Sequence, residues 1–225
     1  MGFEVETYNK SYPLVIDPVL VFVTYSGSTA DNFGFTATYD SHGNLYAGGN
    51  VSEPTLLPNG KYPTTAGAFQ QTYAGTGSDN GPYSGFPCDI AISKYDSSGK
   101  ILLYATYLGG TDNDYPHSLI VDEYDRLVML GSTYSTNFPV LKNCYDTTKS
   151  NGNGNADIVL VKFNVNGTKL LGSTYLGDSA NDGVNGSPLV YNFADDFRGD
   201  VLVDIKGNIL VASCTESKHF PTKMA

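Results

Sequence analysis

Ile101-Leu-Leu-Tyr-Ala-Thr-Tyr-Leu-Gly-Gly110 is a short apolar run that ends in Thr-Tyr and then glycine. Two similar runs flank it: Leu20-Val-Phe-Val-Thr-Tyr-Ser-Gly27 precedes it, and Leu170-Leu-Gly-Ser-Thr-Tyr-Leu-Gly177 follows it. Self-similarity at a spacing of tens of residues is the signature of a repeat architecture. The run therefore indicates that the chain is built from copies of one structural unit.

Three further markers recur in step with this run. An Asp followed by a turn and an apolar strand occurs at Asp40, Asp122 and Asp204, each 82 residues from the next. The sequence Asp-Ile, followed by apolar residues and Lys, begins at Asp89 and again at Asp157, 68 residues later. The last marker is an aromatic-Pro pair, found at Tyr62-Pro63, Phe138-Pro139 and Phe220-Pro221. The strands keep their length, so the unequal spacings place the long insertions in the connections 51–87 and 178–199.

The composition is that of a turn-rich all-β protein. Among 225 residues there are 25 glycines, and Gly and Asn supply the positive φ angles that tight turns need. The formal net charge of −10 argues against nucleic acids and anionic membranes as partners, because phosphate binding requires basic residues. The chain has no apolar run of about 18 residues, so no transmembrane helix is expected. Met1–Glu6 lacks the basic start and apolar core of a signal peptide.

Alternation of apolar and polar residues predicts short strands throughout the chain. Two of them, at 3–8 and 12–16, lack the repeat markers. The repeat strands are expected at 20–25, 34–40, 45–50, 89–95, 101–107, 118–122, 127–132, 157–163, 169–175, 200–204 and 208–213. The apolar strands at Ile90–Ile92 and Ile158–Val161 should be inner strands buried on both faces, whereas the Thr-Tyr strands should lie nearer an edge.

The turns between these strands favour antiparallel hairpins. Gly43, Gly99, Gly167 and Gly207 stand where a residue with φ above zero closes a type I turn with a bulge. Asp125 occupies the same position in the middle unit, and Asp is one of the few other residue types that tolerate this conformation. The predicted unit is therefore a four-stranded antiparallel meander, which is the description of a propeller blade.

The repeated motifs resemble those of a known family. They are Thr-Tyr-Leu-Gly-Gly, Val-Asp followed by Gly-Asn-Leu-Tyr-Ala-Gly, an aromatic-Pro pair followed by Thr-Thr-x-Gly-Ala-Phe-Gln, and Asp-Ile-x-Ile-x-Lys. Together they resemble SBBP repeats, the β-propeller repeats of secreted and surface bacterial proteins that are common in Bacteroidetes. The resemblance covers about residues 20–222, and it implies a secreted or cell-surface location.

This resemblance implies a division of the chain. Residues 1–18 are interpreted as the C-terminal strands of a preceding β module, and residues 19–225 as propeller repeats. The repeat units are 19–108, 109–176 and an incomplete unit 177–225. The predicted fold is thus a partial, open β-propeller of about two and a half blades, read as a fragment of a larger protein. Open blade edges leave unpaired backbone groups, so self-association through them is expected.

The loops after Thr-Tyr-Gly are rich in Asp and Asn and provide the candidate metal ligands. These candidates are Asp112, Asp114, Asp178 and Asp182. Ca²⁺ prefers six to eight oxygen ligands from carboxylates, amides and carbonyls. The alternative is that Asp and Asn close the turns through their own side chains. No loop matches the spacing of a known calcium motif, so no cofactor is expected, and Ca²⁺ stays as the alternative.

Other groups that carry chemistry are spread over the repeat. Recurrence of Asp89 and Asp157, and of Lys94 and Lys162, predicts a structural role in each unit, because a catalytic role would usually need one special copy. The histidines His42, His117 and His219 occur in different repeat contexts, and none has a second ligand at metal-binding spacing. Cys88 and Cys144 lie in or beside equivalent connections, so a disulfide between them is one interpretation. The favoured interpretation is that Cys88, Cys144 and Cys214 are isolated thiols, since no spacing resembles a metal or redox motif.

The sequence favours a non-enzymatic extracellular scaffold or interaction module of a larger surface or secreted bacterial protein. Its partner would be a protein or glycan at the cell surface. Two alternatives stay open. One is a carbohydrate-binding or Ca²⁺-dependent binding module that uses the long loops, and the other is a polysaccharide hydrolase or lyase with a site on the propeller axis. The chain contains no nucleophile motif such as Gly-x-Ser-x-Gly, and no catalytic residue is assigned.

Overall fold

The computed structural model describes residues 9, 11–12, 20–52, 60–76, 87–150, 154–185 and 196–221. All regular structure in these ranges is β-strand, as the composition predicts. No helix in the described ranges has the length and apolar character needed to cross a membrane. The strands expected at 3–8 and 12–16 lie outside the described residues, apart from Tyr12.

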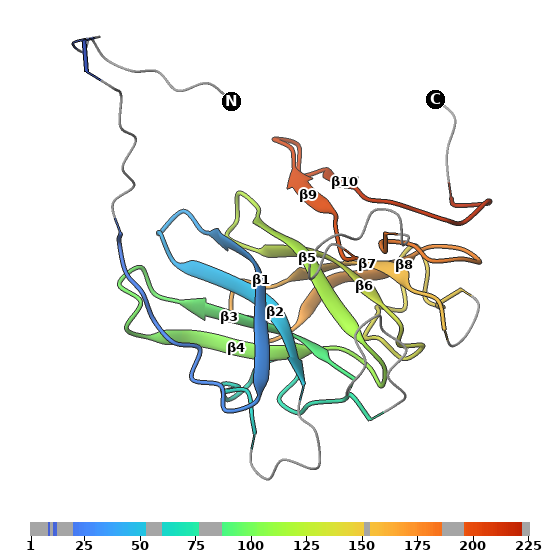
Figure 1. Ribbon diagram of the computed structural model, residues 1–225, viewed down its shortest axis with the longest axis horizontal. Coiled ribbons are helices and arrows are strands. Elements are labelled where there is room, and N and C mark those ends of the chain that lie inside the picture. The colour runs from blue at the N-terminus through green and yellow to red at the C-terminus, as the bar shows by residue number, and fades with distance from the viewer. Residues whose placement is uncertain are drawn as a thin grey trace.

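Within the described ranges, ten strands form two four-stranded antiparallel sheets and one smaller sheet (Figure 1). The first sheet has the order β1-β2-β3-β4 and contains β1 (Asp31–Tyr39), β2 (Leu45–Ser52), β3 (Asp89–Tyr95) and β4 (Leu102–Leu108). The second sheet has the order β5-β6-β7-β8 and contains β5 (Asp114–Val121), β6 (Leu127–Thr133), β7 (Asp157–Phe163) and β8 (Leu170–Leu176). The small sheet pairs β9 (Asp200–Val203) with β10 (Ile209–Ala212). The predicted all-β fold of repeated antiparallel four-stranded sheets is confirmed, and neither sheet closes on itself.

The details of the two sheets repeat as the sequence does. β3 and β7 are inner strands and β4 and β8 are edge strands, as predicted from their composition. The predicted turn glycines all have positive φ, and Asp125 is the one described residue other than glycine with positive φ, at 57°. The first strand of each sheet shifts register at the same place, between Gly34 and Thr36 in β1 and between Pro116 and Ser118 in β5. The shift leaves one residue of each strand outside the ladder.

The prediction of a strand at residues 20–25 is wrong. Residues 20–25 contain the first Thr-Tyr run but form no strand, and Val21, Val23 and Tyr25 are exposed. A strand requires a neighbour for its backbone N–H and C=O groups, and no described strand pairs with this segment. It is held against the first sheet by the Phe22 ring over Gly99 and by the Tyr95 hydroxyl, which lies 3.4 Å from the carbonyl oxygens of residues 25 and 26.

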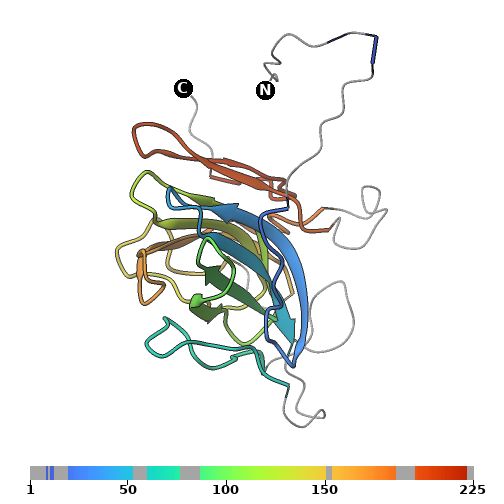
Figure 2. The same ribbon diagram turned by 90° about the vertical axis from the view of Figure 1, so that its left-hand side faces the viewer.

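The sheets follow one another so that β1, β5 and β9, the first strand of each, are neighbours (Figures 1 and 2). The main core lies between the first two sheets, where Tyr46, Ile90 and Ile92 share one buried cluster with Leu127 and Met129. A second cluster joins Val128, Leu130 and Ile158 of the second sheet to Val201 of β9. In both views the small sheet lies at one end of the molecule, beside the second sheet.

The outer face of the first sheet differs from its counterpart in the second. Residues at equivalent positions, 82 or 68 apart, are Ala47 and Met129, Ala91 and Val159, Ser93 and Val161, and Tyr95 and Phe163. The second-sheet residues are buried against the first sheet, whereas the first-sheet residues are smaller or carry a hydroxyl. The Lys61–Thr72 loop lies on part of that outer face, with the rings of Tyr62 and Tyr107 5.6 Å apart.

Candidate functional site

Pairs of buried carboxylates flank a glycine after each of the two described Thr-Tyr strands. A Cβ on Gly109 would lie 2.6 Å from Oδ2 of Asp114 and 2.8 Å from Oδ1 of Asp89. A Cβ on Gly177 would lie 2.9 Å both from Oδ2 of Asp182 and from Oδ1 of Asp157. Each pair joins the start of an inner strand to the start of the following unit, so the carboxylates lie where consecutive units meet.

Hydrogen bonds fix the first pair. Oδ1 of Asp114 accepts a hydrogen bond from the Thr133 hydroxyl, and Oδ2 accepts bonds from the Ser135 hydroxyl at 3.1 Å and from the Gly110 amide at 2.8 Å. The Ser135 hydroxyl also accepts a bond from the Asp112 amide at 2.9 Å. The loop after β4 is thereby tied to the end of β6.

The second pair repeats the same network. Oδ1 of Asp182 accepts a hydrogen bond from the Thr215 hydroxyl, and Oδ2 accepts bonds from the Ser217 hydroxyl and the Asp178 amide, both at 2.9 Å. The Ala180 amide donates to the Ser217 hydroxyl at 3.0 Å. The neighbouring Asn residues match as well: Asn113 Oδ1 accepts from the Cys88 amide and Asn181 Oδ1 accepts from the Ala156 amide, each at 3.0 Å. We call these two arrangements the carboxylate joints.

In each joint, burial raises the pKa of one carboxyl group. Burial, followed by the nearby Asp89, raises the pKa of Asp114 well above its ordinary value. Burial also raises the pKa of Asp157 to about 6, with a smaller contribution from Asp182, although the Ser150 amide and Lys149 act in the opposite direction. Two carboxylates beside each other in a dry site cannot easily both ionise. Each joint is therefore built for hydrogen bonding between units.

The candidate metal ligands fall into these two separate joints. Asp112 and Asp114 belong to the first, and Asp178 and Asp182 belong to the second. The Asp178 carboxylate accepts a hydrogen bond from the Ser179 hydroxyl at 3.3 Å and lies 3.8 Å from Nδ1 of His219. Ca²⁺ prefers ionised carboxylates, whereas both oxygens of Asp114 and of Asp182 already accept hydrogen bonds. The geometry thus favours turn and joint closure by these side chains over calcium binding.

Replacing Asp157 by Asn should change how stability depends on pH. In the unfolded chain the Asp157 carboxyl loses its proton near pH 4, whereas in the folded protein its pKa is about 6. The contribution of this group to the free energy of unfolding of the wild type is therefore lost as the pH rises between those two values. Relative to wild type, the Asn variant should gain about 2 kcal/mol in unfolding free energy between pH 4.5 and 7. Urea unfolding at several pH values measures this difference.

The comparison with wild type is needed because another group acts in the opposite direction. Burial lowers the pKa of His117 to about 3, so its contribution to stability is lost as pH falls below about 6. Both proteins share this histidine, so its effect cancels in the difference. A difference between the two proteins that stays constant from pH 4.5 to 7 would contradict a raised pKa at Asp157.

Recurrent lysines pair with the recurrent turn aspartates. Lys94 Nζ lies 2.9 Å from Asp40 Oδ2 in the first sheet, and Lys162 Nζ lies 2.7 Å from Asp122 Oδ2 in the second. Burial alone would raise the pKa of Asp40, but hydrogen bonds from Lys94 and Asn44 outweigh it and lower the pKa to about 2. The prediction that these lysines have a structural role in each unit agrees with these contacts, which link the β1–β2 and β5–β6 turns to the inner strands.

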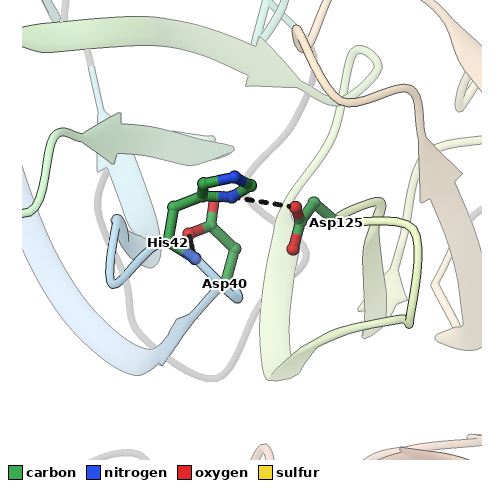
Figure 3. Close-up of side chains that lie close together, drawn as sticks. All are labelled: Asp40, His42 and Asp125. Carbon is green, nitrogen blue, oxygen red and sulfur yellow. Dashed lines mark hydrogen bonds and ion pairs between the residues drawn. The ribbon is translucent and has the colours of Figure 1, made fainter.

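A third cluster lies where the β1–β2 turn meets the β5–β6 turn (Figure 3). One potential ligand atom from each of Asp40, His42 and Asp125 lies within 4.8 Å of the other two. His42 Nδ1 is 3.1 Å from Asp125 Oδ2, and the Ser41 amide donates to Asp125 Oδ1 at 3.0 Å. The buried ammonium of Lys94 already neutralises Asp40. These contacts therefore hold the two turns together, and the cluster is a poor site for a cation.

The remaining predicted residues have structural surroundings. Cys88, Cys144 and Cys214 are free thiols, in agreement with the favoured interpretation, and burial raises the pKa of Cys88 to about 12. Parts of the two long connections, residues 53–59, 77–86 and 186–195, lie outside the described residues.

A scan against models of known protein families found no match, and a search of curated proteins found none either. The site must therefore be interpreted from its own geometry. Sequence reasoning missed the carboxylate joints, although a signal existed. Asp89 and Asp114 are 25 residues apart, as are Asp157 and Asp182, and each Asn-Asp pair is followed later by Thr-x-Ser.

Proposed function

We propose that the chain is a non-enzymatic module of β-propeller type, with about two and a half blades, that acts as an interaction scaffold in a secreted or surface protein. The repetition of its polar clusters supports this. The carboxylate joints and the Lys–Asp pairs each occur in two copies with the same partners. Groups that recur at equivalent positions, within a sheet or between consecutive sheets, have a structural use in every copy.

The observation that carries the proposal is the outward face of the small sheet. On one face of β9 and β10, Val201, Val203 and Ile209 pack against the second sheet. On the opposite face, Leu202 and Leu210 stand directly across from each other and are 56% and 53% exposed. A strand pair that is apolar on both faces is suited to lie between two other layers.

The two ends of the row of sheets therefore differ. The outer face of the first sheet has small or hydroxyl-bearing residues, such as Ala47 and Ser93. The small sheet instead presents Leu202 and Leu210, and one edge of β10 pairs with no strand among the described residues. Unpaired strand edges with apolar neighbours recruit further strands. We infer that this end receives another β-rich module, and that in a solution of the isolated chain a second copy takes that place.

Size-exclusion chromatography with light scattering tests this inference. The wild-type chain should form dimers or larger assemblies as its concentration rises. The double variant Leu202→Ser and Leu210→Ser should stay monomeric over the same range. Runs with Ca²⁺ and with EDTA should coincide if the joints need no cation. A wild-type chain that stays monomeric at every concentration, or a double variant that associates equally well, would contradict the proposal.

A further inference from the structure

An open hollow of about 360 Å³ lies between β1, β5 and the segment 197–199 that leads into β9. Its lining includes Phe35, His117 and Gly199, which are 82 residues apart and therefore equivalent in the repeat. Phe35 and His117 are the residues left out of the ladder by the register shifts of β1 and β5. One repeat position thus contributes a residue from each unit to the lining: Phe in the first, His in the second and Gly, which has no side chain, in the third.

His117 differs from the other copies in having a hydrogen-bonding ring. Nε2 lies 2.9 Å from the Ser132 hydroxyl oxygen, and that hydroxyl donates its own proton to the Gly183 carbonyl at 3.1 Å. Nε2 must therefore carry the imidazole proton, which leaves Nδ1 as an acceptor. Burial lowers the pKa of His117 to about 3, so the ring is neutral at ordinary pH.

Nδ1 of His117 has no donor among the described residues, although the side chain is only 9% exposed. This nitrogen lies beside Gly199, since a Cβ there would lie 3.0 Å from it. A buried acceptor without a partner is costly. The arrangement suits a ligand that brings an O–H or N–H donor into the hollow.

The walls around this acceptor are aromatic. Phe33 is 54% exposed, Phe35 is half-buried, and the Phe197 ring is stacked on Tyr115 with centroids 3.8 Å apart. Arg198 also lines the hollow. A flat ligand with an apolar face and donors around its rim matches these surroundings.

We propose that the hollow binds a sugar ring, with one hydroxyl donating to His117 Nδ1 and the C–H face of the ring against Phe33 and Phe35. A sugar combines hydroxyl donors with an apolar ring face. A nucleotide would also bring a flat ring and a donor, but its phosphates are disfavoured by a chain of net charge −10. The site is distinct from the leucine face at β9 and β10, so either can exist without the other.

Saturation-transfer NMR with methyl glucoside, methyl galactoside, methyl mannoside, methyl glucuronide and adenine tests the site. At least one glycoside should receive saturation from the wild-type protein, and adenine should not. Failure of all four glycosides at millimolar concentration, or binding of adenine alone, would overturn the proposal.

Two variants locate the binding. His117→Phe introduces the residue found at the equivalent position of β1 and removes the acceptor. Gly199→Ala places a methyl group 3.0 Å from Nδ1, 2.9 Å from the Leu130 side chain and 3.2 Å from the Ala212 carbonyl oxygen. Each should weaken glycoside binding at least tenfold, since a lost hydrogen bond to a buried group has that effect.

The matched control is Ile205→Ser, a change at a fully exposed residue in the β9–β10 turn. It should bind the glycoside as the wild type does. Circular dichroism establishes that each variant is folded, and Gly199→Ala serves if His117→Phe is not. Unchanged affinity in a folded variant of either position would place the ligand elsewhere and overturn the assignment.

Discussion

Replacing Gly49 by alanine should lower the free energy of unfolding by about 3 kcal/mol or more. Gly49 lies in β2 opposite the register shift of β1, where a Cβ would overlap the Phe33 carbonyl oxygen. Gly131 occupies the same place in β6, with the Tyr115 carbonyl oxygen 2.5 Å from the position of its Cβ. A backbone atom cannot move aside as a side chain does. The equivalent Gly131→Ala change should therefore also be strongly destabilising.

Gly34→Ala is the matched control for Gly49→Ala. It lies in the strand paired with β2, yet no atom lies within 4 Å of the position of its Cβ, and its φ is not positive. Its effect should stay within about 0.5 kcal/mol. Chemical denaturation of the three variants compares them directly. Equal stabilities for Gly49→Ala and Gly34→Ala would show that the carbonyl contact does not restrict this position.

Lys94→Met should cost about 3 kcal/mol, because it leaves the Asp40 carboxylate buried without its cation. The side chains of Lys94 and Asp40 are only 6% and 1% exposed. The equivalent change in the second sheet, Lys162→Met, should cost about 1 kcal/mol. Lys162 is more exposed, and Asp122 retains Arg126, whose Nη2 lies 2.7 Å from the same carboxylate oxygen.

The same denaturation experiment ranks the two lysine variants. The ranking is a sharp test, because the two lysines occupy equivalent positions and receive the same substitution. The double variant Arg126→Met and Lys162→Met should lower the free energy of unfolding about as much as Lys94→Met does. If Lys162→Met alone lowers the free energy of unfolding as much as Lys94→Met does, then Arg126 does not compensate for the loss of Lys162.

Much of the fold could be predicted from the repeat. The strands, the inner place of the Ile90–Ile92 strand and the left-handed conformation of Asp125 follow from local composition and turn chemistry. The segment at residues 20–25 shows the limit of that reasoning. Its alternation is that of a strand, but a strand also needs a partner, and no local pattern reveals whether a partner is present.

The site was less accessible to sequence reasoning. The sequence indicated that Lys94 and Lys162 are structural, but their partners Asp40 and Asp122 lie at different sequence separations because the connecting loops differ in length. The hollow at His117 depends on register shifts in two strands, and such bulges leave no clear trace in composition. The sequence analysis places His117 with two other histidines in different repeat contexts, whereas the structure shows that Phe35 and Gly199 occupy the equivalent positions of the other units.

The carboxylate joints also bear on how such chains can be lengthened or recombined. Each joint takes Asp89 or Asp157 from the middle of one sheet, its glycine from the end of that sheet, and its hydroxyls from the next. A gene segment that encodes one whole sheet would therefore sever two joints. A cassette cut between β2 and β3 and again between β6 and β7 would carry one complete joint from Asp89 through Ser135, so duplication or exchange should succeed with that frame.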